Sequence, residues 1–462
     1  MKKCLKWLIL GIALVFLTGC SKNSEVKVGE FTPIIDNDGA DPNIFQADGY
    51  YYYTKTTGDN VTLWRSKYLT TLLSGEKQVV WTAPNDTDSA WAPELHRIAG
   101  VWYIYFAYNP TSDIHQMYVL SNKDKNPLSK NWKLSKMVGM DDKFAIDGTV
   151  LTVGDKNYFV WSGWQGDENV AQNLYIAAMT SPMAIVKGQK ILISQPQYAW
   201  EKNGNPLVNE GPEVIIHKGV INLTYSASGS WDNDYCLGLL TANVGANLLN
   251  PKSWIKQKKP IFEKTADTFG PGHNGFATSE DGKENWLIFH TARWNHGGWN
   301  REVRLQEFTW TKENTIKLSA PLSAQNLQKL PSGEPERIRL AASNGSLSGD
   351  LKVENDEQAV EKKAVVGFEN FTDKLTLDFK VDSGVYTLIV YVKTSNQSDV
   401  NSLDALDLTI NGKKTGTGTI EPSQYYQPVQ FTVNLSKTNQ LTIQSDVGGS
   451  KLAIDRVELI KE

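Results

Sequence analysis

The sequence has very little cysteine, no long apolar run and little net charge. Its three cysteines are Cys4, Cys20 and Cys236, and two of them lie within the first twenty residues. Once that segment is removed or modified, Cys236 is alone, so an internal disulfide cannot hold the core. The longest apolar stretch, Trp7 to Leu17, is too short to cross a bilayer as a helix. A formal charge of −4 argues against nucleic acid or an anionic membrane surface as the main partner.

The N-terminal segment reads as an export signal, because three lysines in the first six residues precede the short apolar run. The sequence Leu17-Thr18-Gly19-Cys20 resembles a bacterial lipobox. That resemblance implies cleavage before Cys20 and attachment of lipid to its thiol. We therefore expect a lipoprotein signal peptide over residues 1–20 and a polar tether over 21–30. The protein would be exported and anchored to the bacterial cell envelope by this lipid alone, with the periplasmic or surface face left open.

Tryptophan is absent from the last 152 residues, although the chain contains fifteen, so its composition is split. The earlier part repeats a pattern of short apolar run, tight turn and aromatic run. The turns carry marker glycines spaced 51, 54, 65 and 63 residues apart: Gly49, Gly100, Gly154, Gly219 and Gly282. A recurring unit of this size predicts a radial array of small sheets, a β-propeller. The opening strands are expected at Asp41 to Phe45, Trp91 to Ile98, Asp147 to Val153, Gly211 to His217 and Gly275 to Ser279.

The expected fold is therefore all-β, with a five-bladed propeller followed by a jelly-roll-like β-sandwich. We assign the propeller to residues 31–330 and a linker to 331–345, where Pro331 and Pro335 flank polar residues. Residues 346–462 show the alternating pattern of evenly spaced strands, as in Lys374 to Val381, which is typical of a sandwich.

Three of the five opening runs carry an acid at a matching place: Asp41, Asp147 and Glu210. Taken singly each is weak evidence, since Asp41 before a proline and Asp147 before a glycine have the sequence context of ordinary turn residues. The innermost strands of a propeller crowd one central channel, so we expect the three carboxyls to meet there. Burial and mutual repulsion would keep one of them protonated at neutral pH beside ionised partners. A protonated donor beside a carboxylate base is what cleavage of a glycosidic bond requires.

Five motifs then resemble those of glycoside hydrolase family 43, over about Phe31 to Leu330. They are Ala40-Asp41-Pro42, Trp91-Ala92-Pro93-Glu94-Leu95, Ile146-Asp147-Gly148, Asn209-Glu210-Gly211-Pro212 and Gly270-Pro271-Gly272-His273-Asn274. The resemblance implies a five-bladed propeller that cleaves arabinose- or xylose-containing glycans with inversion. It implies that Asp41 is the general base, that Glu210 is the general acid, and that Asp147 raises the pKa of Glu210. Glu213 competes for the acid role, although its place inside the following strand fits the family less well.

Four further residues are candidates for the substrate site: Trp91, Trp164, His273 and Arg304. The two indoles can pack against the C–H face of a sugar, but packing between blades accounts for them as well. The resemblance implies that Arg304 reaches substrate, against the rival interpretation of a solvated strand residue. It also implies that a calcium or sodium ion can sit in the channel near His273, through a water, although no cofactor is required. An ordinary buried histidine is the alternative.

The motif set is most similar to α-L-arabinofuranosidase branches of the family, with β-xylosidase and endo-arabinanase as the nearest alternatives. A lipoprotein that binds glycan without catalysis is the alternative from another class. The long connections Gly163 to Gln172 and Asn295 to Asn300 are expected to form the rim of the site.

The C-terminal part resembles carbohydrate-binding modules of family 6 or 35, in Val381 to Thr387 and Leu452 to Leu459. Such modules stack sugar on an exposed aromatic ring, and this one lacks tryptophan. Tyr425 and Tyr426 are the best stacking candidates, and a module that only buttresses the propeller is the alternative.

Overall fold

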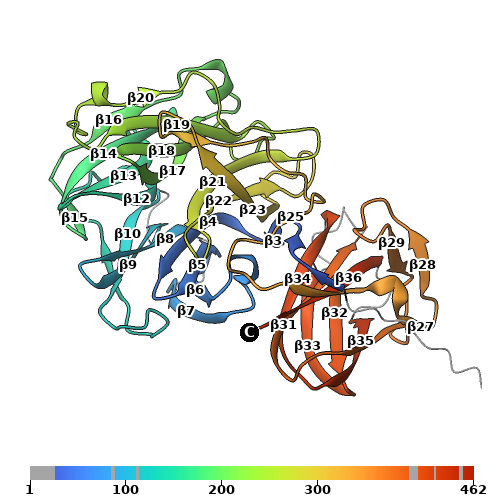
Figure 1. Ribbon diagram of the computed structural model, residues 1–462. Helices are drawn as coiled ribbons and strands as arrows, with labels where there is room; N and C mark the ends of the chain where they lie inside the picture. The colour runs from blue at the N-terminus through green and yellow to red at the C-terminus, as the bar shows by residue number, and fades with distance from the viewer. Residues whose placement is uncertain (1–25, 85–88, 111–113, 395–403, 421–422, 447–450) are drawn as a thin grey trace, which may run out of the picture.

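The structure, a computed structural model, describes residues 26–84, 89–110, 114–394, 404–420, 423–446 and 451–462 (Figure 1). Cys20 and the predicted signal peptide lie outside the described residues, so both stay predictions. The described residues form strands with four one-turn 3-10 helices: η1 (Leu69–Thr71), η2 (Ala199–Glu201), η3 (Pro251–Ser253) and η4 (Ala342–Asn344). Within these ranges no helix is long and apolar enough to cross a membrane.

Two four-stranded antiparallel sheets open the propeller. The first contains β4 (Ala40–Ala47), β5 (Tyr50–Thr56), β6 (Asn60–Ser66) and β7 (Glu76–Thr82). The second contains β8 (Ala90–Ile98), β9 (Val101–Tyr108), β10 (Gln116–Asn122) and β11 (Lys133–Lys136). Each sheet is a meander in chain order, because tight turns join neighbouring strands.

The third and fourth sheets are joined by a short parallel pairing of β14 with β17. The third contains β12 (Ala145–Val153), β13 (Lys156–Trp164), β14 (Ala171–Ser181), β15 (Ala184–Ile185) and β16 (Ile191–Ser194). The fourth contains β17 (Leu207–His217), β18 (Val220–Ala227), β19 (Cys236–Asn243) and β20 (Ile255–Lys256).

The fifth sheet closes the ring with help from the N-terminal segment. It contains β21 (Phe269–Thr278), β22 (Asn285–Ala292), β23 (Arg301–Trp310) and β24 (Ile316–Lys317), and β3 (Ile34–Asp36) pairs with β23 at its edge. Strand β21 begins six residues before the predicted Gly275, because the glycine-rich stretch before it also pairs, with two register shifts. The innermost strands β4, β8, β12, β17 and β21 each lie against the next, and β21 lies against β4. This closed ring is the predicted five-bladed propeller.

The aromatic residues pack between the blades rather than inside each blade. Strand β9 shows the arrangement: Trp102, Ile104 and Phe106 join the cluster shared with the first sheet, whereas Tyr103 and Tyr105 join the one shared with the third. Both faces of a central blade strand are therefore buried, and the sequence reads as a continuous apolar run. Five such clusters separate the five blades.

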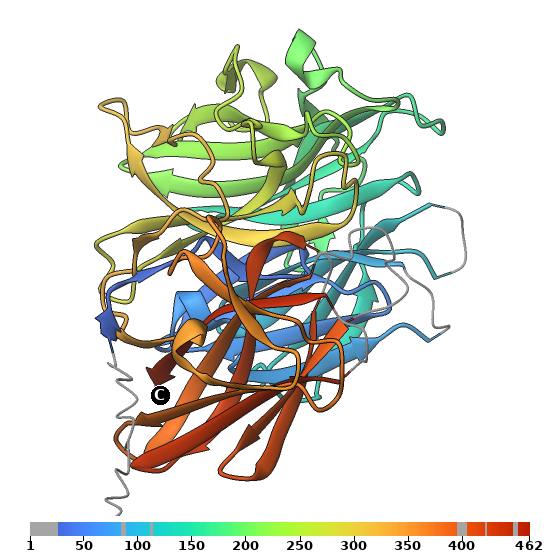
Figure 2. The ribbon, with the colours of Figure 1, turned by 90° about the vertical axis from the view of Figure 1, so that its right-hand side faces the viewer.

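The C-terminal part is a β-sandwich whose two sheets enclose one apolar core. The larger sheet contains β1 (Val26–Val28), β26 (Arg337–Ala341), β28 (Lys352–Asn355), β29 (Lys363–Val366), β31 (Gly384–Thr394), β34 (Ser423–Leu435) and β36 (Leu452–Lys461). The smaller contains β27 (Ser346–Ser348), β30 (Lys374–Lys380), β32 (Asp404–Ile410), β33 (Lys413–Ile420) and β35 (Thr438–Ser445). Figures 1 and 2 show the sandwich, orange to red, beside the propeller.

Two predicted boundary segments differ from the structure. Residues 26–30 were expected in a tether, but β1 pairs with β26 and β2 (Glu30–Phe31) pairs with β25 (Gln328–Lys329). The predicted linker 331–345 contains β26, whose Arg337 and Leu340 are buried. The polar side chains in both segments suggested solvated chain, but Arg337 and Arg339 of the second segment are buried in ion pairs with Glu458, and Arg339 also pairs with Glu30 of the first.

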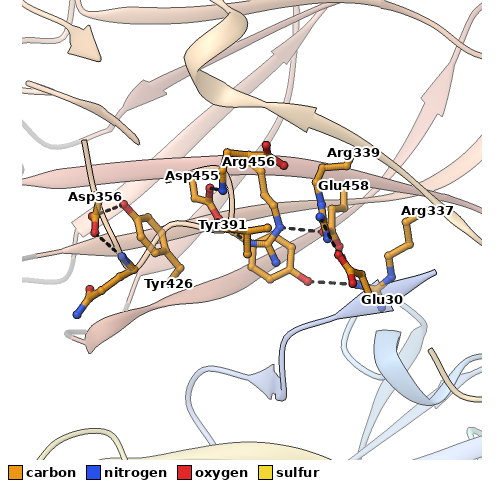
Figure 3. A network of polar contacts seen from close by, with 12 residues as sticks. Glu30, Arg337, Arg339, Asp356, Tyr391, Tyr426, Asp455, Arg456 and Glu458 are labelled. Carbon is orange, nitrogen blue, oxygen red and sulfur yellow. Dashed lines mark hydrogen bonds and ion pairs between the residues drawn. The ribbon is translucent and has the colours of Figure 1, made fainter. Parts of the chain in front are cut away.

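A buried ionic network crosses the larger sheet of the sandwich and reaches the propeller (Figure 3). Glu458 accepts hydrogen bonds from Arg337 at 2.8 Å, Arg339 at 3.0 Å and Arg456 at 2.8 Å. Arg337 also donates to Thr70 Oγ1 at 2.6 Å, which lies in η1 of the propeller. Arg337, whose charge is paired with Glu458, thus connects the sandwich to the first blade.

Candidate active site

All five innermost strands carry the same backbone irregularity. Each has a β-bulge that contains a residue with φ between 45° and 55°: Asp41, Ala92, Asp147, Gly211 and His273. Positive φ is uncommon for residues other than glycine, and it clusters at functional sites. The bulge interrupts pairing at one level of the channel, so the side chains and amide groups at that level are available to each other.

Asp41 stands in this position on β4 and is surrounded by hydrogen-bond donors. Thr56 Oγ1 donates to its Oδ2 at 2.7 Å, and His273 Nδ1 lies 3.1 Å from its Oδ1. Arg301 Nη1 lies 3.5 Å from the same oxygen. Burial alone would raise the pKa of Asp41, but the His273 cation, hydrogen bonds and Arg301 together hold it well below its ordinary value. Its side chain keeps 14% of its surface exposed, so an ionised carboxylate faces solvent here.

The backbone of Asp41 also determines which ring nitrogen of the neighbouring His290 lacks a proton. The amide N–H of Asp41 donates to His290 Nδ1 at 3.0 Å, so that nitrogen carries no proton. Burial, with the nearby Arg301 cation, lowers the pKa of His290 to about 3. His290 is therefore neutral and positions Asp41 by accepting from its backbone.

Glu210 is 7% exposed on β17, and the Tyr235 hydroxyl donates to its Oε1 at 2.9 Å. Burial, followed by the charge of Asp147, raises the pKa of Glu210 to about 8. This carboxyl is accordingly protonated at neutral pH. It stands one residue before the bulge position, at the same level as Ala40, so its phase in the repeat differs by one residue from that of Asp41 and Asp147.

Asp147 is 4% exposed on β12, and its Oδ2 accepts the amide N–H of Gly211 at 2.9 Å. That bond fixes the chain directly after Glu210. Burial raises the pKa of Asp147, although the His273 cation opposes the shift. The acids of the first, third and fourth blades are therefore brought together in the channel.

His273, on β21, stands among all three carboxyls. Its backbone N–H donates to Ser226 Oγ at 2.8 Å, which fixes the strand opposite Glu210. Burial lowers the pKa of the His273 imidazole, but the charges of Asp41, Asp147 and Glu210 raise it to about 10 overall. His273 is thus a cation that compensates the buried carboxylates.

A protonated His273 does not fit the role of a direct metal ligand. Among the described residues, no group of three or more His, Cys, Asp or Glu side chains is placed to hold a metal ion. A channel ion bridged to His273 by water stays a prediction.

A second polar layer is formed by the first paired residue after the bulge on each innermost strand. It consists of Asn43, Glu94, Thr149, Glu213 and Asn274. Burial raises the pKa of Glu94 to about 8, and burial with the neighbouring Glu94 raises that of Glu213 well above its ordinary value. Glu213 therefore pairs with Glu94 in this layer, whereas Glu210 lies on the other side of the bulge, at the level of Ala40.

Trp91 and Trp164 are both half-buried, with one ring face covered. Trp91 stacks on His115 with ring centroids 3.5 Å apart, and Trp164 stacks on Phe144 at 4.6 Å. Their contact with sugar stays a prediction. Beside Trp164, part of the predicted rim lines a groove of about 830 Å³, which includes Gln165, Asn173 and Leu207.

The predicted substrate contact of Arg304 is wrong. Its side chain is fully buried on β23, paired with Glu302 at 2.7 Å and bonded to Thr268 Oγ1 at 2.9 Å. Arg301, three residues earlier, is the arginine that reaches the channel. Side chains three positions apart on a strand point to opposite faces, so the two arginines cannot share one site.

The predicted stacking role of Tyr425 and Tyr426 is also wrong. The two side chains are 6% and 4% exposed, so no sugar can lie on them. The Tyr425 hydroxyl donates to the backbone oxygen of Asp267 in the propeller at 3.0 Å, and that of Tyr426 donates to Asp356 at 2.8 Å. They belong to strand β34 and its contacts rather than to an exposed loop.

The sequence analysis missed Thr56, Ser226, Tyr235, His290 and Arg301. Three of them share a signal: Thr56, Ser226 and His290 are the second-strand partners of Ala40, Glu210 and Gly272, each the last paired residue before the bulge. Aligning the second strands of the repeats would have found these three. Tyr235 and Arg301 come after loops whose lengths differ between the repeats, so the positions of these two residues cannot be aligned from one repeat to the next.

Comparison with known proteins gives a match over residues 31–316 to the family model described as glycosyl hydrolases family 43. An extracellular exo-α-(1→5)-L-arabinofuranosidase of Streptomyces avermitilis is 38% identical over 310 residues, which are 63% of this chain and 64% of that protein. α-L-Arabinofuranosidase 43 of Humicola insolens is 37% identical over 328 residues, 67% of this chain and 66% of that protein. The chain thus spans slightly less than two thirds of the length of these relatives.

Solved structures show the same architecture. An α-L-arabinofuranosidase from Lactobacillus brevis superposes with a TM-score of 0.58 and 33% identity, over 62% of this chain and 96% of that one. The Bacteroides ovatus protein described as xyloglucan PUL GH43B covers 93% of this chain and 98% of its own, with a TM-score of 0.52 and 14% identity. At that identity the second likeness shows the fold alone.

Proposed function

The chain belongs to the glycosyl hydrolases of family 43, and from this membership we propose that it releases terminal α-L-arabinofuranose from plant-type glycans with inversion. One observation carries the proposal: one channel holds a carboxyl that faces cations and hydrogen-bond donors, and a second carboxyl that is buried beside a third. Asp41 is ionised because cations and donors surround it, and Glu210 is protonated because it is buried beside Asp147. An acid and a base poised together at neutral pH are the two groups that hydrolysis of a glycosidic bond uses.

In the proposed reaction, Glu210 gives its proton to the glycosidic oxygen as the bond from that oxygen to the sugar breaks. Asp41 takes a proton from a water that attacks the anomeric carbon from the opposite face. The sugar leaves with a new hydroxyl, the remaining glycan regains its hydroxyl, and the configuration is inverted. Asp41 then releases its proton to solvent and Glu210 takes one up, which restores the starting state.

Asp147 acts through Glu210 in this proposal. Its charge adds to the burial that raises the pKa of Glu210, and its bond to the Gly211 amide supports the backbone that carries Glu210. His273 and Arg301 offset the summed negative charge, so that Asp41 stays ionised beside two other carboxyls.

Arabinofuranose is proposed because two relatives above 35% identity are named arabinofuranosidases. The same acids would serve a β-xylosidase or an endo-arabinanase, so specificity must come from the rim. One relative is named as an extracellular enzyme, which supports export, and the Leu17-to-Cys20 sequence supports lipid attachment at Cys20.

The test is hydrolysis of aryl α-L-arabinofuranoside, aryl β-xyloside and debranched arabinan by the parent, Asp41→Asn and Glu210→Gln. We expect arabinose from the first and third substrates, and losses in kcat/KM of about 10²–10⁴-fold in each variant. Exposed acids provide matched controls, Asp155→Asn and Glu313→Gln, which should behave like the parent. A parent that binds arabinan but releases no pentose from any substrate would replace the proposal with a glycan-binding function.

A further inference from the structure

Two tryptophans in neighbouring loops are exposed, unlike the other described tryptophans. Trp231, between β18 and β19, is 36% exposed, and Trp299, between β22 and β23, is 69% exposed. Their rings lie 6.4 Å apart at an angle of 86°, so they form an open corner. Two large apolar rings left in water at one place on the surface indicate a binding surface.

Hydrogen bonds between the two loops hold the corner in place. Asn233, itself 8% exposed, donates to Asn295 Oδ1 at 2.6 Å and accepts the backbone N–H of His296 at 3.0 Å. The Trp231 ring rests on glycine backbone: a Cβ added at Gly229 would lie 2.6 Å from that ring. A preformed aromatic surface loses little entropy on binding.

The corner is also connected to the proposed catalytic carboxyls. Trp299 Nε1 donates to Ser230 Oγ at 3.3 Å, and Arg301 donates to the Ser230 carbonyl at 2.9 Å while its other nitrogen faces Asp41. The loop that carries Trp231 ends at Tyr235, which donates to Glu210. The two rings are therefore connected to both carboxyls of the proposed reaction, to Asp41 through Arg301 and to Glu210 through the loop that ends at Tyr235.

We propose that Trp231 and Trp299 form a binding site for the sugar on the leaving-group side of the scissile bond, a pentose of the remaining glycan chain. One indole covers the C–H face of that sugar, and the other, nearly perpendicular, contacts its edge. This inference rests on the proposed glycosidase function. It makes the corner a determinant of oligosaccharide specificity.

The test compares a substrate that has a leaving-group sugar with one that lacks it. For Trp231→Ala and Trp299→Ala, we expect kcat/KM on α-1,5-arabinotriose to fall about ten-fold more than on methyl α-L-arabinofuranoside. The Phe variants should recover most of the difference, because they keep an aromatic face. Ile255→Ala, which removes an apolar side chain that is 67% exposed on β20, is the matched control and should keep the parental ratio.

Equal losses on both substrates, or an unchanged ratio in both Ala variants, would overturn the inference. Calorimetric titration of Glu210→Gln with arabinotriose separates this failure from that of the proposed function. If the parent cleaves nothing, yet arabinotriose binds and the Trp→Ala changes weaken binding about ten-fold, the corner stands and the hydrolase proposal falls. If arabinotriose fails to bind, or binds equally without either ring, the corner is not a sugar site.

Discussion

At the scale of single residues, neighbours decide what an identical carboxyl group does. Asp41 faces His273, Thr56 and Arg301, which favour its charged form. Glu210 has one hydroxyl donor and a second carboxyl nearby, so burial is the largest influence on its pKa and favours the protonated form. The result is a low pKa for the proposed base and a pKa of about 8 for the proposed acid, which sets the expected pH range of activity.

The first prediction concerns the basic limb of that range. Activity requires protonated Glu210, so kcat/KM should decline as pH rises through about 8. Asp147→Asn removes the charge that raises the pKa of Glu210 and should move this decline to lower pH. Tyr235→Phe removes a hydrogen bond that lowers the same pKa and should move the decline to higher pH. The measurement is the pH profile of kcat/KM for the three proteins.

The opposite signs of the two shifts distinguish electrostatic tuning of Glu210 from general damage to the site. Asp155→Asn, in an exposed turn, should leave the profile in place. Shifts of the same sign in both variants would show that Glu210 is not the titrating acid.

The sequence predicted which acids share the channel, because each lies near the start of an innermost strand of the repeat, although the phase of Glu210 differs by one residue from that of Asp41 and Asp147. It did not predict Arg301, because that residue follows a loop and the choice between positions 301 and 304 depends on strand register. Nor could the sequence reveal the charge of His273. The pKa of about 10 comes from three carboxyls contributed by three other blades.

At the scale of elements, the bulge in each innermost strand builds the site. The bulge accommodates Gly211 with φ near 52°, and its amide then reaches Asp147. The strands themselves were predictable from the repeated apolar and aromatic runs. The bulges were not predictable, because an Asp-Pro or Asp-Gly pair reads equally well as a turn.

The second prediction tests this bulge with Gly211→Ala. A Cβ there would lie 3.1 Å from the His273 ring, in a backbone conformation that costs a residue other than glycine roughly 1–2 kcal/mol. Gly219→Ala is the matched control, since its φ is also positive, at 83°, but its nearest neighbour is 3.9 Å away. We expect both variants to lose stability in urea titration, and Gly211→Ala alone to lose kcat. Equal kcat values would show that His273 accommodates the methyl group freely.

At the scale of the whole molecule, the sandwich is built into the propeller rather than appended to it. The N-terminal segment contributes β1 to the sandwich and β3 to the fifth blade, and the larger sheet contacts the propeller through Arg337 and Tyr425. The larger sheet therefore has a structural role at that contact. Composition and alternation revealed the sandwich, but a shared N-terminus is a long-range pairing that leaves no local pattern.

The third prediction concerns the ionic network at this junction. Glu458→Gln leaves the buried Arg337, Arg339 and Arg456 without their shared carboxylate, which should cost about 3–5 kcal/mol of unfolding free energy. Urea titration measures the loss, and kcat on methyl α-L-arabinofuranoside at 25 °C should stay parental. Asp378→Asn, on the exposed face of β30, serves as the control. A loss below about 1 kcal/mol would contradict the importance of the network.

The fourth prediction is the pH dependence of the same stabilisation. Burial would raise the pKa of Glu458, but Arg456, Arg337 and Arg339 lower it from 4.5 to about 2. Because the folded-state pKa is depressed, this contribution is complete above about pH 4.5 and is lost as pH falls toward 2. Urea titrations across that range should show the parent losing stability faster than Glu458→Gln. Parallel curves would show that Glu458 does not carry this linkage.

The most direct test of the account is the anomer first released from an α-L-arabinofuranoside, observed by proton NMR before mutarotation. Attack of a water activated by Asp41, on the face opposite the proton donor Glu210, predicts β-L-arabinofuranose as the first product, with the α anomer growing in later. Initial appearance of the α anomer would contradict the assignment of these two carboxyls as base and acid.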